Sequence, residues 1–153
     1  MIKLSKDDSE ILNEGLDMLN QRVIKNDCDR TRVKDRPLLT SFRDYLESML
    51  TYYCKKNEIK YKQGMNEIVG PFILLKSKIK ISLSRIFNLI SCFIEKYLTN
   101  YYSEDEFFSL QSSLALLNLL LKYHNPLIHG IFEFSLITPE MYATSWVLTI
   151  FAK

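Results

Sequence analysis

The chain has 153 residues, of which 47% are hydrophobic and 25% charged, with four glycines and four prolines. This composition is typical of one globular domain and excludes a disordered or collagen-like chain. The formal net charge of +2 is too small to attract a polyanion through the overall field, so charge alone names no partner. At this length a core can form without disulfides or a structural metal.

The first third of the sequence predicts one helix followed by a charged loop. Apolar residues recur at three- to five-residue steps from Asp7 to Ile24, with acids near the start, which predicts a single amphipathic helix. The segment from Asn26 to Pro37 is polar and ends on a proline. A loop with solvent-exposed side chains is therefore expected there.

Helical periodicity continues through the rest of the chain. Further helices are predicted over residues 38–56, 64–75, 82–98 and 104–123, in a short segment from 126, and over 141–151 after a Thr-Pro-Glu start signal at 138–140. Arg43, Asp44 and Glu47 form the polar face of the first of these. Pro71 should kink the second or mark its boundary. The uncharged run Leu114–Leu121 indicates a central helix contacted from several sides.

These segments predict an all-α fold, a non-repeating array of about seven helices. No uncharged run is long enough to cross a bilayer, and the N-terminal residues lack the apolar stretch of a secretory signal, so a cytoplasmic protein is expected. Cys28, Cys54 and Cys92 are widely spaced and are interpreted as reduced thiols. With only two histidines, both far from every cysteine in sequence, no zinc site is expected.

Charge is distributed unevenly along the chain. Residues 51–80 contain a lysine strip, with lysines at positions 55, 56, 60, 62, 76, 78 and 80 against only Glu58 and Glu67. Such a strip could face an acidic protein, a phosphate-bearing ligand or an anionic membrane, or it could be an ordinary solvated region. The sequence leaves these alternatives open.

Few residues are available for hydrolytic or nucleotide chemistry. The sequence lacks the motifs of serine hydrolases, zinc proteases, P-loop proteins and dinucleotide-binding proteins. His124 and His129 have no nearby carboxylate to orient a ring, so both are interpreted as structural or surface residues. Trp146 lies among aromatic residues at helical spacing and is expected in the core, and no nucleic-acid partner is expected.

Two polar segments lie where packing alone does not explain them. The first is IKNDCDRT, residues 24–31, which presents Arg30 on a loop after the first predicted helix. The second is YKQGMN, residues 61–66, in which Gly64 precedes an apolar helix and the amide of Gln63 is free to reach outward. Each also has a purely structural interpretation: an ion pair between Asp27 and Arg30, and an N-cap region around Gln63.

Together, the two segments resemble the IxxDxxRT and YxQGM motifs of TBC domains, which activate GTP hydrolysis by Rab-type small G proteins. A third stretch, PEMYATSWVLTIF at residues 139–151, is similar to a later TBC segment with a buried tryptophan. The three stretches follow the family's order over residues 24–151. The resemblance implies that residues 1–153 form the N-terminal and central portion of a TBC domain, with its C-terminal helices missing. An exposed apolar face near the C-terminus is therefore expected.

The resemblance also implies a mechanism. GTP hydrolysis builds negative charge on the transferring phosphoryl group, and an arginine supplied in trans stabilises that charge. Arg30 is expected to be this arginine finger, and Gln63 is expected to orient the attacking water as a glutamine finger. The supporting residues in the two motifs are Asp27, Thr31, Tyr61, Gly64 and Asn66.

Chemistry indicates roles for three of these supporting residues. Asp27 can hold an arginine through a charge-assisted hydrogen bond, and arginines at positions 30, 32 and 36 are within reach by sequence. Tyr61 is expected to pack or hydrogen-bond so that it fixes the turn of the second motif. Gly64 allows a close approach or a backbone dihedral that a side chain would block.

The resemblance implies a GTPase activator with no cofactor of its own, because GTP and Mg²⁺ belong to the partner. That partner is a Rab-type small G protein in its GTP form. A role in vesicle trafficking follows, with peripheral association to endomembranes through the partner. The alternatives are a non-catalytic TBC-type module that binds a small G protein or scaffold, and an unrelated helical interaction domain whose lysine strip contacts an acidic partner.

Overall fold

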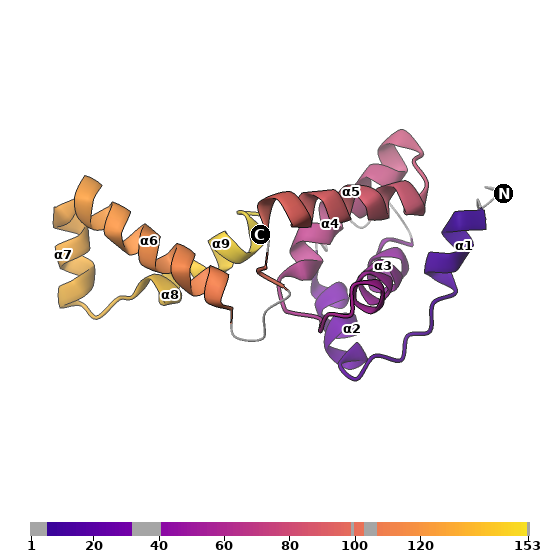
Figure 1. Ribbon diagram of the computed structural model, residues 1–153, viewed down its shortest axis with the longest axis horizontal. Coiled ribbons are helices and arrows are strands. Elements are labelled where there is room, and N and C mark those ends of the chain that lie inside the picture. Colours follow the sequence, from indigo (N-terminus) through magenta and orange to yellow (C-terminus); the bar gives the residue numbers. More distant parts are fainter. Residues whose placement is uncertain (1–5, 32–40, 99, 103–106, 153) are drawn as a thin grey trace. The chain divides into compact units, whose positions relative to one another are not determined.

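A computed structural model describes residues 6–31, 41–98, 100–102 and 107–152 (Figure 1). Within these ranges the chain forms nine α-helices and no strand, which confirms the all-α prediction. The helices are α1 (Lys6–Leu12), α2 (Gln21–Arg30), α3 (Phe42–Lys56), α4 (Met65–Ile79), α5 (Leu83–Tyr97), α6 (Phe108–His124), α7 (Pro126–Phe134), α8 (Pro139–Tyr142) and α9 (Thr144–Thr149).

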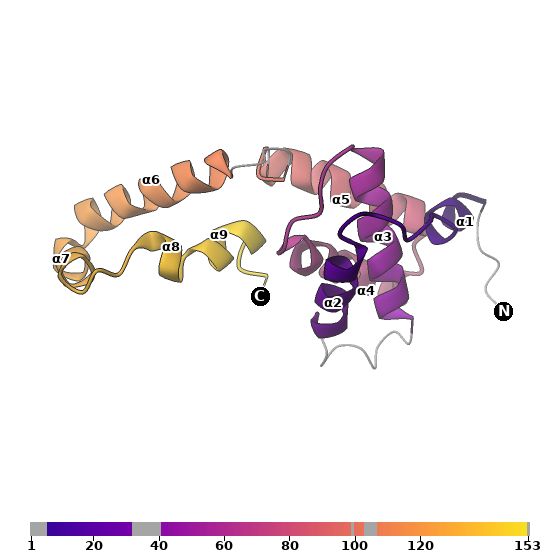
Figure 2. The same ribbon diagram turned by 90° about the horizontal axis from the view of Figure 1, so that it is seen from below.

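The residues group into two compact units, 1–103 and 104–153. The first unit is built around α3, which packs against α1, α2 and α4, while α5 packs against α4 and α1 (Figures 1 and 2). All nine residues from Leu46 to Cys54 are buried, so α3 is covered on every side. The prediction that Glu47 belongs to an exposed polar face is therefore wrong, because α2 covers that side of α3.

The single helix predicted from Asp7 to Ile24 is also wrong, because α1 ends at Leu12 and α2 begins at Gln21. Gly15 lies in the interruption, where its backbone freedom disfavours a helix. Leu16 and Leu19 were expected on the apolar face of that helix, yet both are exposed, so no core-facing stripe spans the gap.

The helix predicted over residues 64–75 is present as α4, and it continues through Pro71 to Ile79, so no boundary falls at the proline. It ends where Lys80 adopts a left-handed conformation, with φ 49°. The next helix, α5, has two caps at its start. The Ser82 hydroxyl accepts from the Arg85 N–H at 3.4 Å, and the buried Asp8 carboxylate of α1 accepts from the Leu83 N–H at 2.6 Å.

In the second unit the chain runs along α6, turns at α7 and returns beside α6 through α8 and α9 (Figure 2). Helix α7 starts as predicted at Pro126, with the Asn125 side chain accepting from the Ile128 N–H at 3.2 Å. The helix expected over 141–151 is divided into α8 and α9. The Thr144 hydroxyl donates to the Glu140 carbonyl at 2.7 Å, a contact that commonly bends helices.

The run Leu114–Leu121 does not form the central helix that its sequence predicts. Only Leu110 and Leu114 of α6 are buried, whereas Leu119 is 63% exposed. Many large hydrophobic side chains of this unit are exposed, among them Leu116, Leu119, Leu120, Tyr123, Leu127, Ile131, Phe134, Leu136 and Met141. None of the helices in the described ranges is long and apolar enough to span a membrane.

Candidate functional site

Helix α2 carries the first motif and ends on Arg30. Ile24 and Cys28 lie one turn apart and are both fully buried, so they anchor this face of α2 against the first unit. Arg30 lies outside this anchored face, and its side chain is 58% exposed. The loop expected over residues 26–37 is therefore wrong for residues 26–30, which are helical, and its remainder from residue 32 lies outside the described residues.

Asp27 is the buried centre of the site, with only 2% of its surface exposed. Its Oδ1 pairs with Nη2 of Arg30, and its Oδ2 accepts a hydrogen bond from the Tyr61 hydroxyl at 2.7 Å. A buried carboxylate is costly unless charge and hydrogen bonds compensate it, and here each oxygen has a donor. Asp27 thus joins the arginine of the first motif to the tyrosine of the second.

The second motif forms a turn that leads into α4. Tyr61 is buried, and its carbonyl accepts a hydrogen bond from the Asn20 side chain at 3.2 Å. Gly64 precedes the helix with φ 107°, a conformation that disfavours any residue with a Cβ. Gln63, immediately before Gly64, has its side chain exposed to solvent.

Asn66, in the first turn of α4, bridges the two motifs. Its Oδ1 lies 3.1 Å from the Tyr61 hydroxyl and accepts from the Gly64 N–H at 3.1 Å. Its Nδ2 donates to the Thr31 hydroxyl at 2.8 Å, and that hydroxyl donates in turn to the Asp27 carbonyl at 2.6 Å. Asn66 and Thr31 are both buried, so the bridge is shielded from water.

The structure thus brings five of the predicted residues into one hydrogen-bonded cluster, the finger network, which consists of Asp27, Thr31, Tyr61, Gly64 and Asn66. Arg30 is attached to it through Asp27, and Gln63 is the chain neighbour of Gly64. The exposed guanidinium of Arg30 therefore lies beside Asp27 of the network, and the exposed amide of Gln63 lies beside Gly64.

Burial sets the protonation of the neighbouring groups. The pKa of Tyr61 is raised far above its ordinary value, first by burial and then by its hydrogen bond to Asp27, so the hydroxyl remains a donor. Burial, reinforced by the charges of Glu47, Asp27 and Asp29, likewise raises the pKa of the Cys28 thiol. Cys28 is therefore a neutral packing residue and a poor nucleophile.

The sequence reasoning missed a second polar cluster between α2 and α3. The Gln21 amide donates to Glu47 at 2.9 Å and to the Thr51 hydroxyl at 3.1 Å. These contacts compensate the burial of Glu47, which is only 7% exposed. The available signal was the i, i+4 spacing of Glu47 and Thr51, which places both on one face of a helix.

An ion pair also ties the last turn of α2 to the start of α3. Arg43 Nε lies 2.9 Å from Asp29 Oδ1, and both side chains are close to half exposed. Because Asp29 precedes Arg30, this pair restrains the end of the helix that bears the candidate finger. It was not predicted, since Asp29 lies in the segment that was expected to be a solvent-exposed loop.

The lysine strip does not form one uniformly basic face. Lys55 is paired with Glu14 and Asp17, and these contacts raise its pKa. Lys76 lies 3.5 Å from Asp8 and above the ring of Tyr45. Two of the seven lysines of the strip are thus ion-paired within the first unit.

The histidines and the tryptophan lie in the second unit. His129 is buried in α7 and His124 is exposed at the end of α6. A carboxylate does lie near His129, since Glu133 Oε2 is 3.9 Å from its Nδ1, which is too far for a hydrogen bond. Trp146 was expected in the core but is 45% exposed, with its ring near those of Tyr142 and Phe151.

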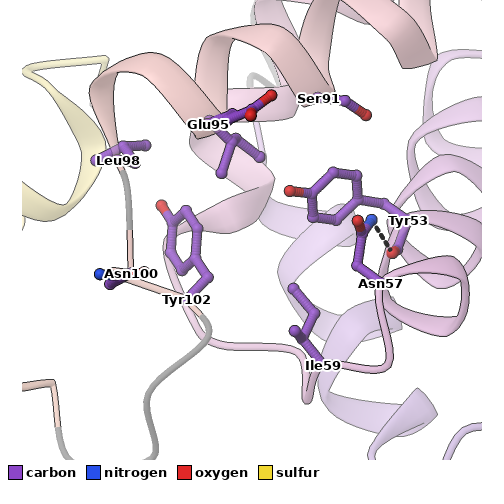
Figure 3. A pocket seen from close by; sticks show the side chains of 9 residues that line it. Tyr53, Asn57, Ile59, Ser91, Glu95, Leu98, Asn100 and Tyr102 are labelled. Atoms are coloured by element: carbon purple, nitrogen blue, oxygen red, sulfur yellow. Dashed lines mark hydrogen bonds between the residues drawn. The ribbon is translucent and has the colours of Figure 1, made fainter.

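A cavity of about 460 Å³ lies between the ends of α3 and α5, and its lining includes Tyr53, Asn57, Glu95 and Tyr102 (Figure 3). The phenol rings of Tyr53 and Tyr102 both face this space. Burial raises the pKa of Tyr53 to about 12, so its hydroxyl is neutral. The Asn57 amide donates to the Tyr53 carbonyl at 2.8 Å. No residue of either motif lines the cavity.

The described residues contain no group of three or more histidine, cysteine or acidic side chains placed to hold a metal ion. An exposed guanidinium, always charged, can stabilise developing negative charge, and an exposed amide can both accept and donate hydrogen bonds. Such a pair suits a protein that acts on a charged group held by another molecule.

The chain is thus all-α within the described residues and presents an exposed arginine and an exposed glutamine beside one buried network. Residues 3–153 match the family described as the Rab-GTPase-TBC domain, and the chain belongs to this family. The expected resemblance to TBC domains is confirmed.

Curated relatives agree with this assignment. The chain is 30% identical over 95 residues to the TBC domain-containing protein kinase-like proteins of Homo sapiens and Gallus gallus, which covers 61% of this chain and 10% of each relative. The protein of that name from Dictyostelium discoideum is 27% identical over 93 residues, or 60% of this chain and 9% of its own length. The aligned part therefore spans about a tenth of the relatives' length.

Proposed function

We propose that this chain accelerates GTP hydrolysis on a Rab-type small G protein by supplying Arg30 and Gln63 in trans. Membership of the Rab-GTPase-TBC family supports the partner class. The observation that carries the proposal is the finger network, which holds Arg30 through Asp27 and forms the turn that carries Gln63. The guanidinium and the amide are therefore fixed to the same buried framework while both side chains remain exposed.

Arg30 acts on the phosphoryl group that is being transferred. Its ion pair with Asp27 uses one nitrogen, Nη2, whereas a guanidinium carries five N–H donors. Arg30 can therefore keep its contact with Asp27 and still donate to phosphoryl oxygens of the partner's nucleotide. An arginine supplied in this way is worth on the order of 10³–10⁵ in rate.

Gln63 orients the attacking water. The carbonyl of its amide accepts a hydrogen from water, and its NH₂ group donates to the phosphoryl oxygens or to the backbone of the G protein. Neither step requires an ionisable side chain. The left-handed conformation of Gly64 sets the direction of the chain immediately after Gln63.

The partner in this proposal is the GTP form of the G protein, which brings the nucleotide and Mg²⁺, so the chain needs no cofactor of its own. Membrane contact follows from the partner and places the activity in vesicle trafficking, peripherally on endomembranes. The chain contributes catalytic groups in trans and is not a nucleotide-binding enzyme by itself.

Phosphate release from a panel of GTP-loaded Rab proteins tests the proposal. The parent chain should stimulate at least one Rab, and Arg30→Ala should lose most of that stimulation, on the order of 10³-fold. Gln63→Ala should also lose a large part of it. Arg22→Ala, another exposed arginine of α2, and Gln111→Ala, an exposed glutamine of α6, are the matched controls.

The outcomes separate catalysis from binding. Equal activity in the parent, Arg30→Ala and Gln63→Ala chains would contradict the two-finger mechanism. Binding to a GTP-loaded Rab without any stimulation would instead support the non-catalytic TBC-type module. Measuring affinity with a non-hydrolysable GTP analogue on the Rab shows which of the two applies.

A further inference from the structure

We propose that Asn66 is a positioning residue that fixes the arginine and glutamine fingers in position relative to each other. This inference rests on the proposed GTPase-activating function and assigns a specific task within it. Asn66 binds Thr31, which directly follows Arg30, and Gly64, which directly follows Gln63. One side chain thus connects the two residues that adjoin the fingers.

The hydrogen bonds around Asn66 have only one consistent direction. The Gly64 N–H can only donate, so the atom that faces it must be the carbonyl oxygen of the Asn66 amide. The NH₂ group is then turned toward Thr31 and donates to its hydroxyl. That hydroxyl in turn donates a hydrogen bond to the Asp27 carbonyl at 2.6 Å.

This directionality explains why an asparagine is suited to the position. The site needs an acceptor on one side, for the turn, and a donor on the other, for Thr31, at the end of α2. An aspartate has the same shape but offers no donor when ionised, and it adds a second buried carboxylate close to Asp27. An alanine removes both contacts and leaves the Gly64 N–H and the Thr31 hydroxyl without this partner.

Burial separates this task from contact with a partner protein. Asn66 is 3% exposed and Thr31 is fully buried, so a bound G protein has little access to either side chain. Their replacement should therefore change the placement of the fingers and leave the docking surface intact. The consequence is a loss in kcat with little change in KM or affinity, because correct geometry is needed only in the transition state.

The experiment measures stimulated phosphate release, as kcat and KM, on a Rab that the parent chain activates. Asn66→Ala and Thr31→Val should each lower kcat by about 10-fold or more, since a misplacement of about 1 Å can cost on the order of 10²-fold. Thr31→Ser keeps the hydroxyl and should stay within about threefold of the parent. Affinity for the Rab loaded with a non-hydrolysable GTP analogue should change by less than about threefold in all three variants.

Several results would overturn the assignment. It fails if Asn66→Ala and Thr31→Val leave kcat unchanged, if affinity falls as much as kcat does, or if Thr31→Ser is as impaired as Thr31→Val. Should Asn66→Ala not fold, as judged by circular dichroism, the near-isosteric Thr31→Val and Thr31→Ser pair decides alone. Absence of stimulation by the parent chain would overturn the proposed function itself, whereas normal stimulation with unaffected variants overturns only the role of Asn66.

Discussion

Helices α3 and α6 both differ in burial from what their sequences predict, and they differ in opposite directions. The α3 sequence mixes acids, bases and hydroxyls with apolar residues, yet every residue from Leu46 to Cys54 is buried. The α6 sequence carries the uncharged run Leu114–Leu121, yet of these residues only Leu114 is buried.

The length of the neighbouring helices explains this difference. Each of the two helices packs against three others, which have 7, 10 and 15 residues around α3 but only 9, 4 and 6 residues around α6. Helix α3 packs against α1, α2 and α4, and its polar side chains find partners there, as Glu47 and Thr51 do with Gln21. Helix α6 packs against α7, α8 and α9, and of its leucines Leu110 and Leu114 are buried. An apolar run therefore shows that a helix could be buried, whereas the packing partners decide whether it is.

The strongest test of this comparison is a pair of leucine truncations. Leu50→Ala in α3 should lower the free energy of unfolding by about 2–5 kcal/mol, because it opens a cavity at a fully buried position. Leu119→Ala in α6, where the side chain is 63% exposed, should change it by less than about 0.5 kcal/mol. Urea unfolding followed by circular dichroism measures both. Equal losses would mean that α6 is covered in solution.

A second prediction concerns alkaline pH and separates the two units. In α3, burial raises the pKa of Cys54 to about 12 and that of Tyr53 to about 12. A thiol whose pKa is raised in this way stays protonated in the folded chain. In the unfolded chain the same thiol ionises above a pH of about 8.5. The unfolded state then binds fewer protons, so the stability of the first unit should fall as pH rises from about 9 to 12.

Cys54→Ala removes one of these groups and should make that decline shallower, by up to about 1.4 kcal/mol per pH unit. Cys92→Ala, which removes an exposed thiol, is the matched control. Urea titrations at several pH values measure the slope, and Trp146 fluorescence follows the second unit separately because it is the only tryptophan. A slope that is the same in the parent and in Cys54→Ala would contradict the prediction.

The third prediction compares a tyrosine of the finger network with one on the exposed face of α6. Tyr61→Phe removes the hydroxyl that donates to Asp27, leaving one oxygen of a buried carboxylate without that partner. The expected cost is about 1–3 kcal/mol of unfolding free energy. Tyr123→Phe, at a position that is 82% exposed, should cost less than about 0.5 kcal/mol. Chemical denaturation of both variants decides whether the network stabilises the first unit.

Much of the fold was accessible from sequence because helical periodicity and start signals are local properties. The starts of α5 at Leu83 and of α7 at Pro126 follow from a serine cap and from a proline in the first turn. The first helix was predicted wrongly because periodic leucines at 16 and 19 continued the pattern across Gly15. Whether those leucines reach a core depends on tertiary packing, which periodicity does not contain.

The candidate site shows the same division. Short motifs identified Arg30 and Gln63 as candidate fingers. The local chemistry of Asp27 and Gly64 indicated an arginine partner and an unusual dihedral, and the structure has both. The bonds from Tyr61 to Asp27 and from Asn66 to Thr31 join residues more than thirty positions apart, so no local pattern could predict their geometry. The helical ending at Arg30 was also missed, because the charge of residues 26–30 resembles that of a loop.

The last prediction makes the same substitution, glycine to alanine, in each unit. It expects opposite changes in the free energy of unfolding. Gly64→Ala places a Cβ at φ 107° and should destabilise the first unit by about 1–2 kcal/mol. Gly130→Ala lies inside α7, where an added Cβ meets no atom within 4 Å, and should stabilise the second unit by about 0.5–1 kcal/mol. Circular dichroism follows the first variant and Trp146 fluorescence the second. If Gly64→Ala were neutral, the turn after Gln63 would tolerate other conformations, and the finger network could not fix the direction of that side chain.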